Sequence, residues 1–238
     1  MRGKSPKRIA HRKWQIANGD KRYATSKFVL SLLFLWACAL AGCGPQEKSN
    51  LSLMSAEEKK AALLKQLDQK FENPDVHFQL GQLYQAQGQW AKAEYHYNVA
   101  LGFEPAHRPA QAALVKGLAD NGNKAKAQQY AEAYMNQVSS SVTASLQLAE
   151  AFDKQGLDEY ALSCYQQALR LAPDSPEVNK QFGYYYLNND DKTRAKEYLS
   201  RSFQLNPNQP DVAGELGRLG VVVKIPQEAG QTAQKPKS

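Results

Sequence analysis

The chain has 238 residues, 42% of them hydrophobic and 22% charged, a composition that suits one or two globular units. Its formal net charge is +7, yet nine of the 30 Lys and Arg residues and only one of the 23 acids lie in residues 1–27. Residues 28–42 are uncharged, so the remainder holds 21 basic and 22 acidic residues. This body lacks the positive charge that phosphate binding requires, which argues against nucleic acid as a partner.

The first predicted element is an export signal. Phe28–Gly42 is an uncharged, mostly apolar run of 15 residues behind the basic residues 1–27. An α-helix needs roughly 20 residues to cross the hydrocarbon core of a bilayer, so the run is short for a membrane span. Its length and its basic flank are typical of the h-region and n-region of a secretory signal. An uncleaved N-terminal anchor and an ordinary signal peptide remain alternatives.

The run ends in Leu40-Ala41-Gly42-Cys43, which resembles the bacterial lipobox. The resemblance implies cleavage between Gly42 and Cys43 and a diacylglycerol group on the Cys43 thiol. Residues 1–42 are then a lipoprotein signal peptide, residues 43–54 a lipid-anchored tether, and the protein lies in the bacterial cell envelope, facing the periplasm. Gly44 follows in place of aspartate, which by the sorting rule of enteric bacteria favours the outer membrane.

The cysteine content agrees with the predicted location in the cell envelope. Cys38 lies in the predicted signal peptide and Cys43 carries the lipid, which leaves Cys164 alone in the body without a partner for an internal disulfide. We favour an unreactive helix residue for Cys164, with a cross-link between two copies as the alternative.

A capping helix is predicted next, over residues 55–73. Ser55 followed by Glu58 fits a capping box, and one apolar face then follows. That face consists of Leu63, Leu64, Leu67 and Phe71.

Residues 74–209 repeat with a period of 34, in the windows 74–107, 108–141, 142–175 and 176–209. Apolar residues three and four apart predict two amphipathic helices in each window. Position 15 tolerates the left-handed backbone of a tight turn between the helices, small residues at positions 8 and 20 allow close approach, and proline at position 32 ends the second helix. Position 15 is Gly88, Gly122, Gly156 and Asp190, position 20 is Ala93, Ala127, Ala161 and Ala195, and position 8 is Gly81, Val115, Ala149 and Gly183.

These coincident positions resemble the tetratricopeptide repeat (TPR). The resemblance implies an all-α fold, a right-handed α-solenoid of four TPR helix pairs with N- and C-terminal capping helices. The second window departs most from the pattern, at Val115, Ala131, Tyr134 and Ser139. The large residue usual at position 4 is replaced in every window, by His77, Gln111, Ser145 and Asn179.

A C-terminal cap is expected over residues 210–226, because residues 210–219 copy the start of a fifth repeat and "GVVVKIP" follows as a short extended segment. The tail 227–238 is polar, without a core pattern, and is predicted to be disordered.

No enzyme site, metal site or cofactor site is indicated. The four histidines, His11, His77, His96 and His107, lack metal-ligand spacing and are expected at surfaces or edges. The glycines follow the repeat period rather than a nucleotide-binding pattern, and no acid–base pair stands out.

The TPR resemblance implies a concave groove lined by the first helix of each repeat, and this groove is the predicted binding site for a protein or peptide. Tyr184 is the one residue of Tyr184–Tyr186 expected to face it, as a binding anchor or as a structural residue. The candidate groove residues are Gln79, Gln82, Lys116, Glu150, Asp153, Lys180 and Tyr184.

Together these elements predict a membrane-tethered, non-catalytic scaffold that aids assembly or localisation of an envelope complex such as a pilus or secretin. Repeats, lipobox and the run "AKEYLSRSFQLNPNQPDV" resemble pilotin-type TPR lipoproteins. The alternative is an adaptor for a cell-wall enzyme. No feature decides whether the chain forms a homo-oligomer.

Overall fold

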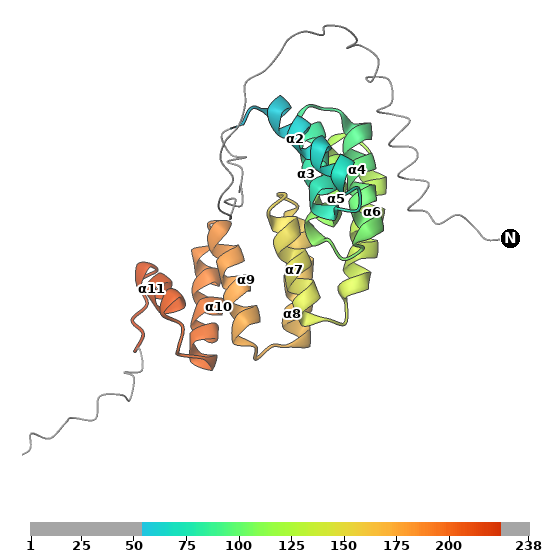
Figure 1. Ribbon diagram of the computed structural model, residues 1–238. Coiled ribbons are helices and arrows are strands. Elements are labelled where there is room, and N and C mark those ends of the chain that lie inside the picture. Colours follow the sequence, from blue (N-terminus) through green and yellow to red (C-terminus); the bar gives the residue numbers. More distant parts are fainter. Residues whose placement is uncertain (1–53, 225–238) are drawn as a thin grey trace, which may run out of the picture. The chain divides into compact units, whose positions relative to one another are not determined.

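The computed structural model describes residues 54–224, which form ten helices and contain no strand (Figure 1). The all-α fold predicted from the sequence is therefore confirmed. The predicted signal peptide, the lipobox with Cys43 and the tail after residue 226 lie outside the described residues.

The described residues divide into two compact units, one that ends at Pro105 and one that begins at Ala106, which are described in turn. In the first unit the helices are α2 (Ala56–Gln69), α3 (Pro74–Ala86) and α4 (Trp90–Phe103). In the second they are α5 (Arg108–Asp120), α6 (Lys124–Val138), α7 (Val142–Asp153), α8 (Asp158–Leu171), α9 (Pro176–Asn188), α10 (Lys192–Leu205) and α11 (Pro210–Arg218). Helices α3–α10 form the four predicted pairs, and the two members of each pair pack against each other.

Side-chain caps begin α2 and the first helix of every repeat. At α2 the Ser55 hydroxyl accepts from the Glu58 backbone N–H and the Glu58 carboxylate accepts from the Ser55 N–H, at 3.3 and 2.8 Å, which is the predicted capping box. The first helix of every repeat is capped by the residue just before it. These caps are Asn73, His107, Ser141 and Ser175.

The turn inside each repeat is left-handed at position 15, as predicted. The φ angles are +68° at Gly88, +82° at Gly122, +65° at Gly156 and +59° at Asp190. Asp190 is the one non-glycine with positive φ among residues 54–224. The left-handed residue reverses the chain so that the second helix runs back along the first.

Position 8 governs how closely the two helices of a pair approach. A Cβ at Gly81 would meet the Tyr97 ring, and one at Gly183 would lie 2.7 Å from Leu199 Cγ. In the second repeat the sizes are exchanged, because Val115 stands at position 8 and the small Ala131 at position 24, both fully buried. The second repeat therefore keeps a filled core despite its departures from the pattern.

The polar residues at position 4 are all buried, and three of them bond to backbone that precedes their helix. Ser145 Oγ donates to the Val138 carbonyl at 3.0 Å, and Asn179 Nδ2 donates to the Pro173 carbonyl at 2.9 Å. His77 Nε2 lies 3.0 Å from the Phe71 carbonyl. A carbonyl partner offsets the cost of burying the donor, so in these three repeats position 4 ties the preceding backbone to the helix that follows it.

Each end of the described chain buries an apolar face. In the first unit, Leu63 and Leu67 of α2 join Phe71, Val76 and Leu80 in one cluster. In the second unit, α11 packs against α10 and the two helices share an apolar cluster, against which Val221 and Val223 also lie. That cluster consists of Leu199, Phe203, Val212, Ala213 and Leu216.

Candidate functional site

The candidate groove residues lie on the first helices of the repeats. In the first unit Gln79 is half-exposed and Gln82 exposed, both on α3. In the second unit α5 packs against α7 and α7 against α9, so the first helices follow one another as neighbours. The remaining candidates, Lys116, Glu150, Asp153, Lys180 and Tyr184, lie on these three helices.

Charged candidates on α5 and α7 are paired within their own helices. Lys116 Nζ lies 2.6 Å from Asp120, and the exposed Glu150 lies 2.6 Å from Lys154. Burial raises the pKa of Asp153, and the negative charges of Asp158 and Glu150 add to this effect. Positive and negative side chains thus lie close together on this surface. Such a surface suits a partner that carries both signs of charge better than a partner of one strong charge.

The two candidates on α9 interact with the terminal helix α11. Lys180 Nζ lies 3.6 Å from Asp211 of α11 and 3.5 Å from Glu177 of its own helix. Tyr184 packs against the α10–α11 apolar cluster, and burial, followed by the charges of Asp211 and Glu215, raises its pKa. The cap therefore engages both side chains, and the fourth repeat is the most covered part of the candidate surface within the second unit.

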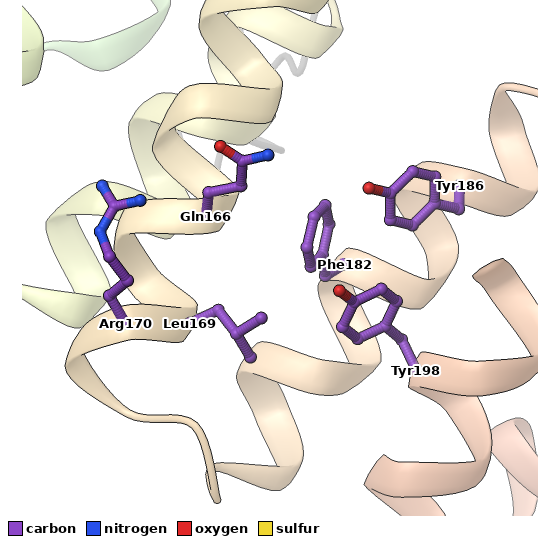
Figure 2. Close-up of a pocket in the computed structure, with 6 residues that line it drawn as sticks. All are labelled: Gln166, Leu169, Arg170, Phe182, Tyr186 and Tyr198. Carbon is purple, nitrogen blue, oxygen red and sulfur yellow. The ribbon is translucent and has the colours of Figure 1, made fainter.

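A pocket of about 270 Å³ lies elsewhere in the second unit, between α8, α9 and α10 (Figure 2). Helix α8 supplies one wall, and the aromatic side chains of α9 and α10 supply the other. The lining residues are Gln166, Leu169, Arg170, Phe182, Tyr186 and Tyr198.

The aromatic wall is a set of rings in mutual contact. The Phe182 ring centroid lies 4.7 Å from that of Tyr186 and 4.5 Å from that of Tyr198. Tyr186 and Tyr198 stack at 5.6 Å with an interplanar angle of 12°, and the Arg194 guanidinium lies 5.2 Å from the Tyr186 centroid. Such contacts fix the rings in place, so the wall exists before any ligand arrives.

The polar groups of the pocket are open to a ligand. Within residues 54–224, no group hydrogen-bonds to the Gln166 amide or to the hydroxyls of Tyr186 and Tyr198. Arg170 donates to Gln167 at 2.5 Å and forms no ion pair in this part of the chain. An apolar wall with a few open polar groups is the usual makeup of a binding pocket.

Three histidines lie in the fold rather than at surfaces or edges, so that expectation was wrong for them. His77 is fully buried, His96 is 5% exposed and His107 is 6% exposed. His77 Nδ1 and His96 Nδ1 are 3.0 Å apart, whereas His107 caps α5 by accepting from the Ala110 N–H. Each ring has a hydrogen-bonding role, which the spacing of histidines along the sequence does not reveal.

Cys164 is a buried thiol in α8, 2% exposed. Burial raises its pKa to about 12, so the thiol stays protonated at neutral pH. A protonated, buried thiol fits the unreactive helix residue favoured from the sequence.

Between residues 54 and 224 no group of three or more His, Cys, Asp or Glu side chains is placed to hold a metal ion. No helix within the same range has the length and apolar character needed to cross a membrane.

The pocket was not predicted from the sequence. Tyr186 was not expected to face the groove and is 7% exposed, but its ring also lines the pocket. The available signal was Tyr198 at position 23, a large aromatic residue that adjoins both Phe182 and Tyr186.

Comparison with protein families gives the class of the repeats. Three segments match tetratricopeptide-repeat families, at residues 74–107, 144–178 and 180–209. Together with the paired helices, these matches show an all-α helical-repeat protein, and more particularly a TPR protein. Tetratricopeptide repeats are protein-interaction modules, typically non-catalytic, and the comparisons found no enzyme family. The general function is that of a scaffold for protein–protein interaction.

Comparisons with individual proteins add distant likenesses. A structure of Pseudomonas aeruginosa PilF is 26% identical, covering 61% of this chain and 67% of that one, with a TM-score of 0.35. MamA from Desulfovibrio magneticus RS-1 is 21% identical, covering 67% and 90%, with a TM-score of 0.35. YrrB, described as a TPR protein with an unusual peptide-binding site, is 16% identical, covering 68% and 84%, with a TM-score of 0.36. No curated protein matches the chain.

Proposed function

We propose that the chain is a lipid-anchored scaffold of the bacterial cell envelope, which binds a protein partner through its repeats and helps to assemble or localise a complex such as a pilus or secretin. One observation carries the proposal: the run Leu40 to Cys43, which resembles a lipobox, precedes a protein-interaction module by a short stretch of chain. An interaction module on a lipid anchor serves to hold its partner at a membrane.

The length of the segment between Cys43 and the first helix sets the distance between the lipid surface and the repeats. Eleven residues, 44–54, separate Cys43 from the capping residue Ser55. As a flexible chain they would span roughly 20 Å on average, which keeps the repeats near the lipid surface. A single acyl chain holds a protein only reversibly, whereas the two chains of a diacylglycerol give stable attachment. Gly44 favours delivery to the outer membrane.

The first-helix surfaces are the proposed partner-binding face. Their side chains carry both charge signs, and Lys116, Glu150 and Asp153 are bonded only locally or half-buried. Local pairs at a surface contribute little stability, so a partner can replace them at small cost.

The anchor is tested by replacing Cys43 with alanine. We expect Cys43→Ala to move the protein from the membrane fraction to the soluble fraction and to abolish incorporation of radiolabelled palmitate. Cys164→Ala is the matched control, because it removes a thiol that lies buried in the fold. The lipoprotein proposal fails if the wild type takes up no label, or if Cys43→Ala still sediments with membranes.

The partner is tested by cross-linking and pull-down from native envelopes. Pilus or secretin subunits as the main prey would support the proposal, and peptidoglycan enzymes would support the adaptor alternative instead. Glu150→Lys reverses an exposed charge on α7 and should weaken capture if the first-helix surfaces bind the partner. A secretin that stays in the outer membrane after deletion of the gene would contradict the pilotin version.

A further inference from the structure

We propose that the pocket between α8, α9 and α10 binds a large apolar side chain of a partner peptide in which acidic residues flank that side chain. This inference rests on the proposed scaffold function, since it specifies the chemistry of a protein partner. It adds a binding site on side chains that are not among the first-helix candidates.

The size of the pocket indicates what fits. Its volume of about 270 Å³ is just below the 300–1,000 Å³ typical of sites for drug-sized ligands. It therefore takes one side chain with part of its backbone rather than a whole cofactor. The wall of Phe182, Tyr186 and Tyr198 with Leu169 opposite offers apolar contact to an aromatic or long aliphatic group (Figure 2).

The polar groups of the pocket fit a peptide backbone. The Gln166 amide can donate and accept, and each tyrosine hydroxyl can do the same. In Figure 2 both hydroxyls are directed toward the α8 side of the pocket, where Gln166 also lies. A peptide amide placed there would find donors and acceptors that no group of residues 54–224 uses.

The charge around the pocket indicates the flanking residues. Arg170 is exposed and lacks a carboxylate partner among residues 54–224. On helix α10, Arg201 is paired with Asp174 at 2.6 Å, whereas Arg194 lies near the aromatic wall. Arg194, over Tyr186, lies 3.5 Å from Asp191, a contact that an incoming carboxylate could share. A cationic rim around an apolar wall is complementary to an apolar side chain between carboxylates.

The chain's own C-terminal segment matches this chemistry poorly. Residues 225–238 contain one acid, Glu228, two lysines and no aromatic residue. A segment from another protein is therefore the occupant we infer.

The test is a selection of phage-displayed random 12-residue peptides on the full chain in detergent, followed by fluorescence anisotropy with the synthetic peptides. We expect the selected peptides to share an aromatic or long aliphatic residue next to Asp or Glu. Arg170→Glu reverses the charge of the rim, and Leu169→Trp fills the pocket. Each should raise the Kd of such a peptide at least tenfold. Lys124→Glu, an equal charge change at an exposed site of α6, should leave the Kd within twofold.

Three results would overturn the pocket while the scaffold function stands. The first is a peptide whose Kd is unchanged by Arg170→Glu and Leu169→Trp but raised by Glu150→Lys. The second is self-association in sedimentation that Arg170→Glu abolishes, because a second copy would then be the occupant. The third is a selection that yields no peptide although envelope cross-linking captures a partner. If neither experiment finds a partner, both proposals fall. Arg170 is exposed, so Arg170→Glu keeps the fold even if Leu169→Trp does not.

Discussion

The first and fourth repeats place side chains of the same kind at equivalent positions and use them differently. In the first, the position-11 ring of Tyr84 stacks on the position-23 ring of His96 at 5.3 Å and 12°. In the fourth, Tyr186 stacks on Tyr198 at 5.6 Å and 12°. A cation from position 19 covers the tyrosine in each case, Lys92 at 5.3 Å and Arg194 at 5.2 Å.

The difference lies in what surrounds the position-23 ring. His96 is 5% exposed and its Nδ1 meets His77 Nδ1, so the first repeat is closed by a buried polar pair. Tyr198 is only half-buried, and its side chain lines a pocket. One backbone frame thus supports either a closed core or an open site, and the choice depends on positions 4 and 23.

The histidine pair has a defined proton arrangement. The Phe71 carbonyl can only accept, so His77 Nε2 carries the proton and donates to it. His77 Nδ1 is then an acceptor, and His96 Nδ1–H donates to it at 3.0 Å. Burial lowers the pKa of His77 to about 4. Burial, with the charge of His77 second, lowers the pKa of His96 to about 3.

The largest expected effect is therefore a loss of stability of the first repeat in acid. Below pH 6.5 the unfolded chain binds protons that the folded pair does not, so stability falls as the pH falls toward the folded pKa values. The loss at pH 5 is about 2 kcal/mol for each histidine. Amide hydrogen exchange, corrected for its intrinsic rate, should show it in α3 and α4, with α9 and α10 as the internal control.

The control transplants the fourth-repeat residues into the first. The double variant His77→Asn, His96→Tyr places there the equivalents of Asn179 and Tyr198, which carry no group that titrates near pH 5. Its stability at pH 7.5 can differ from that of the wild type, but its slope with pH in α3 and α4 should fall by more than half. An undiminished slope would mean that other groups cause the acid sensitivity.

The second largest effect is expected at position 8, which is glycine in both the first and the fourth repeat. Gly81→Ala sets a Cβ against the Tyr97 ring, which is 1% exposed and bonded to Gln85 at 2.7 Å. Gly183→Ala places a Cβ against the Leu199 side chain and 3.1 Å from the Leu199 backbone nitrogen. Neither neighbour can retreat freely, so each variant should lose about 2–3 kcal/mol in urea unfolding.

Ala149→Gly is the matched variant in the third repeat, where position 8 already carries a Cβ. Helix propensity should cost about 1 kcal/mol, and the loss of the buried Ala149 Cβ adds to this cost. If Gly81→Ala is as mild as Ala149→Gly, the close approach of α3 and α4 does not limit the packing of the first repeat.

What was predictable depended on local sequence. The capping box at Ser55 and Glu58 and the left-handed turn at Gly88 rest on residues a few positions apart, so a short stretch of chain determines them. The repeat frame followed because one spacing recurs in four windows. Each of the four windows therefore gives separate evidence for the same pair of helices.

The histidine pair and the pocket were not predictable in this way. His77 and His96 are 19 residues apart, and the pocket joins residues of three helices. In the sequence, polar residues at position 4 resemble surface residues. No neighbouring residue indicates that the Pro173 carbonyl accepts a hydrogen bond from Asn179 in the folded protein. Such partners exist only once the helices have packed.

The smallest expected effect separates the two repeats at position 15, where Gly88 and Asp190 adopt the same left-handed turn with φ of +68° and +59°. A side chain in that region is strained by about 1–2 kcal/mol, and glycine relieves this but loses more entropy on folding. Asp190→Gly should therefore stabilise the protein by about 0.5 kcal/mol, and Gly88→Asp should destabilise it by about 1 kcal/mol in urea titrations. A loss of stability in Asp190→Gly would show that the aspartate side chain contributes to the turn, and that the fourth repeat keeps it for more than its tolerance of positive φ.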